Sequence, residues 1–81
     1  MIDYEILEQK VITYDELKQI KKQLNSLEKL QNCPGRLTIA CYKIAEISID
    51  DKTKALYYVK LSSHDYDEDF TFAIIKQFIT L

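Results

Sequence analysis

Apolar side chains recur at helical spacing through residues 14–31. At the start of this stretch, Thr13 and Glu16 are placed to form a capping box, in which each side chain accepts a hydrogen bond from the other residue's backbone N–H. The pattern predicts a long amphipathic helix over residues 14–31, which the turn-forming pair Pro34-Gly35 ends. Its apolar stripe consists of Leu17, Ile20, Leu24 and Leu27, with Tyr14 and Leu30 at its borders.

Alternating apolar and polar positions predict strands on both sides of this helix. Residues 2–8 alternate loosely and predict a first strand, with a helical start as the alternative. Residues 37–49 and 55–61 alternate across a polar turn, which predicts a β-hairpin over residues 37–61. The alternation changes phase within residues 41–46, and a β-bulge there explains the change.

The C-terminal segment, residues 70–81, fits two structures. As a helix it places apolar side chains on two opposite faces, and the acidic residues 67–69 suit the positive end of a helix dipole. As a strand it alternates only partly, although eight of its twelve residues are β-formers. Its length favours the helix. The expected fold class is therefore α+β: a long amphipathic helix packed on a small antiparallel sheet, the hairpin 37–61, with a C-terminal helix.

Composition narrows the classes of function. The 81 residues include one glycine and one proline, so the glycine-rich motifs of nucleotide-binding loops and nucleophile elbows cannot be built. A hydrophobic content of 47% indicates one globular domain over residues 1–81. His64 is the single histidine, so a hydrolytic triad would have to be centred on this residue. We expect no enzyme activity, no catalytic residues and no cofactor.

The sequence also bears on compartment and source. No basic segment of a signal peptide follows Met1, and no apolar run approaches the roughly 18 residues that a membrane span needs. We therefore expect a cytoplasmic protein without membrane contact, whose cysteines, Cys33 and Cys41, are reduced. Cys41 lies in an apolar stretch and is expected in the core. High isoleucine and lysine with low alanine and arginine are typical of AT-rich coding, which points to a low-GC bacterium or its phages.

The segment 64–69 concentrates four carboxylates beside a tyrosine and the histidine. Its acids copy the first ligand positions of an EF-hand loop, but Phe70 and Lys76 stand where that loop needs glycine and glutamate, so we expect no metal site. One interpretation is a solvated loop that caps the next helix. The other is a surface that docks on a basic partner protein, with an exposed sheet tyrosine as an anchor. The partner-binding residues would then be Asp65, Tyr66, Asp67, Glu68, Asp69 and Tyr58.

Three lysines, Lys18, Lys22 and Lys29, project from the polar face of the predicted helix. Such a strip is either an ordinary solvated face or a binding site for nucleic acid. The net charge of −2 and the single arginine, Arg36, argue against nucleic acid as a partner.

Three hypotheses of function stay open. The favoured one is a small intracellular inhibitor or regulator, encoded by a phage or mobile element, that binds a nucleic-acid-handling host protein stoichiometrically. Anti-restriction and anti-CRISPR proteins act in this way, although the chain shares no motif with them. The second hypothesis is a nucleic-acid-binding regulator that uses the lysine strip. The third is a structural subunit that forms homo-oligomers, such as a homodimer, through the helix stripe or the C-terminal apolar face.

Overall fold

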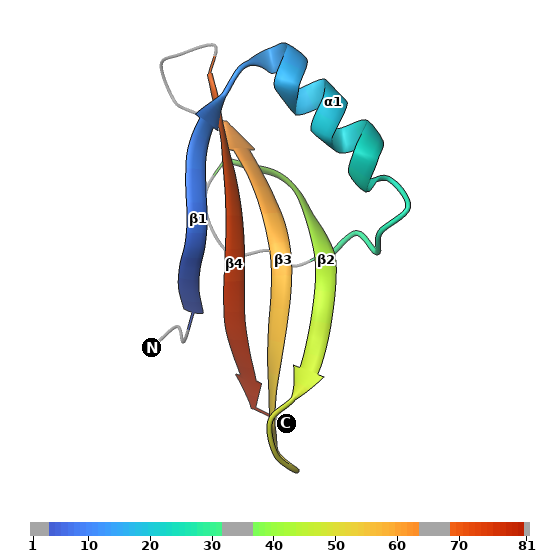
Figure 1. Ribbon diagram of the computed structural model, residues 1–81, viewed down its shortest axis with the longest axis vertical. Helices are drawn as coiled ribbons and strands as arrows, with labels where there is room; N and C mark the ends of the chain where they lie inside the picture. The colour runs from blue at the N-terminus through green and yellow to red at the C-terminus, as the bar shows by residue number, and fades with distance from the viewer. Residues whose placement is uncertain (1–3, 32–36, 64–68, 81) are drawn as a thin grey trace.

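The computed structural model describes residues 4–31, 37–63 and 69–80. The strands form one antiparallel sheet in the order β1-β4-β3-β2 (Figure 1). The described part of the chain is therefore mostly β-sheet, and the expected α+β class, with a long helix on a small hairpin, is wrong. The elements are β1 (Tyr4–Ile12), α1 (Tyr14–Leu24), β2 (Thr38–Ser48), β3 (Thr53–Ser63) and β4 (Phe70–Thr80).

The single described helix, α1, begins where the sequence predicts it but ends early. The side chain of Thr13 accepts a hydrogen bond from the N–H of Glu16 at 3.2 Å, and Glu16 Oε1 accepts one from the N–H of Thr13 at 3.1 Å. This geometry confirms the capping box. The helix stops at Leu24, because Asn25 and Ser26 offer the backbone competing hydrogen bonds and favour turns over helix. The predicted helix over residues 14–31 is therefore too long.

The C-terminal segment is a strand, β4, and the expected helix over residues 70–81 is wrong. β4 lies inside the sheet and pairs with β3 on one side and with β1 on the other. Both neighbours accept and donate backbone hydrogen bonds, which satisfies the polar groups on both edges of a central strand. Phe72 and Ile74 pack on the core cluster of one side of the sheet, and Ala73 and Ile75 belong to the cluster of the other side. The two opposite apolar faces expected of a helix are therefore the two faces of β4.

The hairpin between β2 and β3 is confirmed, although β3 continues past residue 61 to Ser63. Asp50 sets its turn, because Asp50 Oδ1 accepts hydrogen bonds from the N–H groups of Lys52 and Thr53, both at 2.8 Å. The predicted bulge is also confirmed by a register shift between Lys43 and Ala45. Further shifts occur near the start of β2 and in β1. The inserted residues on these two edge strands are aliphatic and exposed: Leu7, Ile39 and Ile44.

The helix α1 covers part of one side of the sheet, which we call the helix face. Leu17 is buried there in one cluster with Ile12, Val59 and Leu61. An 11-residue helix is about 16 Å long, whereas an 11-residue strand is about 36 Å long. The helix therefore covers the strands over part of their length only. We call this covered part, where β1 ends and β2 begins, the helix end, and the opposite part the far end.

A second cluster fills the other side of the sheet, the back face. After α1 the chain pairs with the outer edge of β2, with Lys29 opposite Tyr42. The N–H of Leu30 donates to the carbonyl of Cys41 at 2.9 Å. This pairing brings Leu30 onto the back face, because residues opposite each other on paired strands share a face. The cluster consists of Cys41, Tyr58, Ala73 and Ile75, with Leu30 and Leu56 packed against it.

Cys41 is 1% exposed, which confirms its expected place in the core. It is disulfide-bonded, so the expectation of a reduced thiol at this position is wrong. The other cysteine of the chain, Cys33, lies outside the described residues.

Candidate protein-binding surface

The expected acidic site is only partly described. Asp65, Tyr66, Asp67 and Glu68 lie outside the described residues. Asp69 is exposed where β4 begins, and with Thr13, Tyr14 and Asp15 it lines a shallow hollow of about 310 Å³. The antiparallel pairing of β1 with β4, with Ile12 opposite Phe70, brings the residues after β1 beside the residue before β4. The fold thus assembles one acidic surface, made of Tyr14, Asp15 and Asp69, from two distant parts of the sequence.

Tyr14 is the aromatic residue of this acidic surface, and the sequence pattern misassigned it to the helix stripe. Its side chain is 57% exposed. Its ring centroid lies 5.9 Å from that of Phe70, and Lys18 Nζ lies 5.3 Å from the Tyr14 centroid. These contacts orient the ring while leaving more than half of the side chain to solvent. The capping box was the signal that could have corrected the assignment, because it makes Tyr14 the first helical residue.

Tyr58, the expected sheet anchor, does not reach the surface. It is 1% exposed, and its hydroxyl donates a hydrogen bond to Gln77 Oε1 at 3.1 Å. Burial raises the pKa of the Tyr58 hydroxyl above its ordinary value, and the charge on a nearby Tyr4 would raise it further. The neighbouring Tyr57 is partly exposed on the helix face. The surface role expected for Tyr58 does not fit this placement.

The three lysines of the alternative nucleic-acid site do not share one helix face. Lys18 and Lys22 are exposed on α1, but α1 ends before Lys29. Lys29 instead belongs to the segment paired with β2. Nucleic-acid binding by these residues stays a prediction, but the three lysines do not form the continuous helical strip on which it was based.

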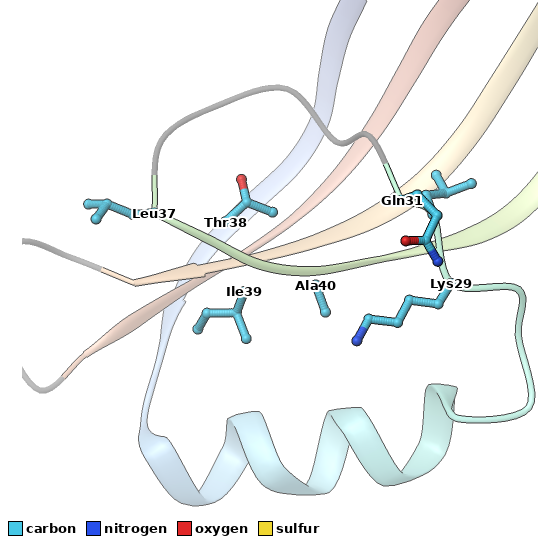
Figure 2. A pocket seen from close by; sticks show the side chains of 7 residues that line it. Lys29, Gln31, Leu37, Thr38, Ile39 and Ala40 are labelled. Atoms are coloured by element: carbon cyan, nitrogen blue, oxygen red, sulfur yellow. The ribbon is translucent and has the colours of Figure 1, made fainter.

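A second hollow, of about 380 Å³, lies where this segment meets the start of β2. Figure 2 shows the side chains of Lys29, Ile39 and Ala40 on the side of β2 that faces α1. Leu37 borders the hollow with a φ of 62°, in the left-handed region that costs a non-glycine residue about 1 kcal/mol or more. Its carbonyl accepts a hydrogen bond from the N–H of Ser63 at 3.0 Å, which holds this conformation. Among the described residues that line the hollow, Lys29 is the sole ionisable one, so these residues offer no acid–base pair.

Exposed apolar side chains form the third feature of the surface. At the far end, Ile47 and Phe78 are 52% and 37% exposed, because α1 does not extend over them. Lys76 Nζ lies 5.0 Å from the ring centroid of Phe78 and 5.7 Å from that of Tyr57. On β1, the apolar residues with large exposed areas are Tyr4, Ile6, Leu7 and Val11.

The described residues also bear on two other kinds of site. They contain no group of three histidine, cysteine, aspartate or glutamate side chains that could hold a metal ion. Within the same ranges, no helix has both the length and the apolar character to cross a membrane.

Comparisons with known proteins assign no family to this chain. No family model matches the chain, and neither curated proteins nor solved structures show a significant similarity to it.

Proposed function

We propose that this chain is a protein-binding inhibitor or regulator that acts stoichiometrically, by docking its acidic surface on a basic surface of another protein. The observation that carries the proposal is the exposed ring of Tyr14 beside the hollow that Asp15 and Asp69 border. A tyrosine held by its neighbours supplies a large contact area at a low entropic cost. The carboxylates steer the surface toward positive charge and exclude acidic partners.

The charges on this surface are available to a partner. The described ion pairs lie elsewhere, on β2, β3 and the segment before β2: Lys43 with Glu28 at 3.3 Å and with Glu46 at 3.1 Å, and Lys54 with Glu46 at 3.6 Å. No described ion pair neutralises Asp15 or Asp69. Asp15 also suits the positive end of the α1 dipole, but no described cation offsets the charge of Asp69 on the same hollow. A partner with basic side chains would use both carboxylates.

The partner class follows from the same chemistry. A protein that handles nucleic acid carries a basic surface, and an acidic module that occupies this surface blocks it. The proposal includes a phage or mobile-element origin and a cytoplasmic site of action. The disulfide at Cys41 is the observation that argues against the cytoplasm, because disulfides persist mainly in oxidising compartments. Alkylating free thiols in intact cells before lysis measures the redox state of Cys41 directly.

The binding test uses the full chain as bait in a lysate of a low-GC bacterial host. We expect one dominant basic partner. Added duplex DNA should release this partner from the bait, because DNA and the bait compete for the same basic surface of the partner. With the purified partner, calorimetry should show that Asp15→Asn with Asp69→Asn weakens binding about tenfold or more at low salt. Tyr14→Ala should weaken it by a comparable factor.

The matched control is Asp50→Asn with Asp51→Asn, which likewise removes two exposed carboxylate charges, both in the hairpin turn at the far end. The amide at position 50 keeps an accepting oxygen for the turn. This control should change the dissociation constant less than twofold. Equal weakening by the control would show that net charge, and not the acidic surface, drives binding. Unchanged affinity in the Asp15 and Asp69 double variant would overturn the proposal.

A further inference from the structure

The two edges of the sheet differ in what covers them. The outer edge of β2 is paired by residues 28–30. The strand β1 pairs with β4 on one side, and no described strand pairs with its other side. The helix α1 runs from the end of β1 toward β2, away from this outer edge (Figure 1). Every residue from Tyr4 to Val11 is exposed, and the outer edge of β1 presents a row of backbone donors and acceptors that no described strand pairs.

A bulge decides which side chains of β1 share a face. The register shifts between Ile6 and Glu8, so Leu7 is inserted relative to β4. Beyond the bulge, Lys10 lies opposite Phe72 on the helix face, and before the bulge Glu5 lies opposite Lys76 on the same face. Because of the inserted residue, Glu5, Glu8 and Lys10 all belong to the helix face. The back face of β1 carries Tyr4, Ile6, Gln9 and Val11.

This arrangement is self-complementary in one antiparallel register. When Tyr4 lies opposite Val11 of a second copy, Glu5 lies opposite Lys10 and Ile6 opposite Gln9, with like faces together at these positions. The inserted Leu7 then lies opposite Glu8 at the centre. A shift by one residue in either direction places helix-face residues against back-face residues. Among the other face-matched registers, one sets Glu5 against Glu8 and one, over residues 8–12, sets Lys10 against Lys10, and like charges directly opposite destabilise a sheet. A register centred on Gln9 sets Glu8 against Lys10, but it matches assigned faces over residues 8–10 only. The register with Tyr4 opposite Val11 therefore pairs the most residues without like charges opposite each other.

We propose that β1 pairs with β1 of a second copy of this chain in that register, to form a continuous eight-stranded sheet. The two-fold axis passes between Leu7 and Glu8, so each dimer contains two Glu5–Lys10 pairs and two Tyr4–Val11 pairs. The bulge and the charged residues of β1 disfavour pairing with other strands, whereas this register allows pairing with β1 of the second copy. An interface of one strand pair is small, at the low end of specific interfaces, below about 1,200 Å². The dimer is therefore in equilibrium with monomer at micromolar concentrations.

Charge exchange tests the register. Sedimentation velocity over a concentration series should show a monomer–dimer equilibrium for the wild-type chain. Glu5→Lys and Lys10→Glu should each weaken it about tenfold or more, since each variant places two like-charge pairs across the interface. A mixture of the two variants should dimerise about as well as the wild-type chain, because both cross-strand pairs are then of opposite charge.

The control is Glu8→Lys, which makes the same charge change on the same strand but lies opposite Leu7 in the proposed register. It should alter the dimer constant less than twofold. Amide hydrogen exchange of the wild-type chain supplies a readout without a variant, because β1 amides that point away from β4 should gain protection as concentration rises.

Three outcomes would overturn the proposal: a monomer at all concentrations, a dimer indifferent to both swaps, or sensitivity to Glu8→Lys in place of Glu5→Lys. None of these bears on the acidic surface, which lies beyond the end of β1. A Tyr14→Ala variant should dimerise normally, so the two proposals stand or fall separately.

Discussion

The helix end and the far end of the sheet are built from the same strands, but they differ in what lies over them. Leu61 at the helix end is fully buried, whereas Ile47 at the far end is 52% exposed. Both are aliphatic residues at inward positions of the helix face, and the strand pattern treats them alike. The difference teaches that burial along these strands depends on the reach of α1 and not on the alternation of the strands.

This division separates the part of the sheet that is buried under α1 from the parts that solvent reaches. The cluster around Leu17, Val59 and Leu61 supplies apolar burial on the helix face. The far end and β1 leave apolar side chains and backbone groups to solvent, where they can contact other molecules. The acidic surface lies where the covered region begins, on the first turn of α1.

The largest contrast between the two ends should appear when equal volumes are removed from each. Leu61→Ala and Ile47→Ala delete the same number of carbon atoms. Leu61→Ala should lower the free energy of unfolding by about 2–5 kcal/mol, because it leaves a cavity in the buried cluster. Ile47→Ala should cost less than about 1 kcal/mol. Urea denaturation measures both values, and equal losses would break the distinction between the ends.

The attachment of α1 can be weakened without touching the core. Thr13→Ala removes the hydroxyl that accepts from the N–H of Glu16, and it should cost about 1 kcal/mol. The loss should be smaller in Thr13→Ser, which keeps an accepting oxygen. Urea denaturation of both variants measures the effect. A null effect of Thr13→Ala would mean that packing alone holds the helix on the sheet.

The smallest expected effect distinguishes two neighbouring tyrosines. Burial raises the pKa of Tyr58, so its neutral form is favoured by folding. This contribution is fully present below the unfolded tyrosine pKa of about 10 and is lost as the pH rises through the higher folded value. Between about pH 9 and pH 11, the wild-type chain should therefore lose more stability than Tyr58→Phe. Tyr57→Phe is the control, and thermal unfolding at each pH gives the comparison.

The sequence was informative where neighbours in the chain decide the structure. The capping box at Thr13 and the turn at Asp50 each depend on hydrogen bonds within three residues, so their residue types are sufficient to predict them. The hairpin follows from two alternating segments on either side of such a turn. The phase change near Lys43 likewise marked a bulge, because an inserted residue alters the alternation itself.

Predictions from sequence patterns failed where contacts between distant segments determine the structure. The segment before β2 pairs with Tyr42 and Cys41 instead of extending α1, and helical spacing cannot reveal a strand partner. The same limit applies to the candidate site: Asp69 was interpreted within a loop that either binds a partner or caps a helix, and Tyr14 at the border of the helix stripe. Their neighbourhood exists because β1 and β4 pair, and that pairing joins the two ends of the chain.

By itself, then, the sequence determined the start of the helix, the hairpin and its turn, and the absence of glycine-rich nucleotide motifs. Only the tertiary structure decided that residues 70–80 form a central strand, that Tyr58 is buried while Tyr14 is exposed, and that no described strand pairs with the outer edge of β1. The physical reason is the range of the interactions. Caps and turns satisfy backbone groups locally, whereas an apolar segment takes the conformation in which partners far away in the sequence satisfy its backbone and cover its faces.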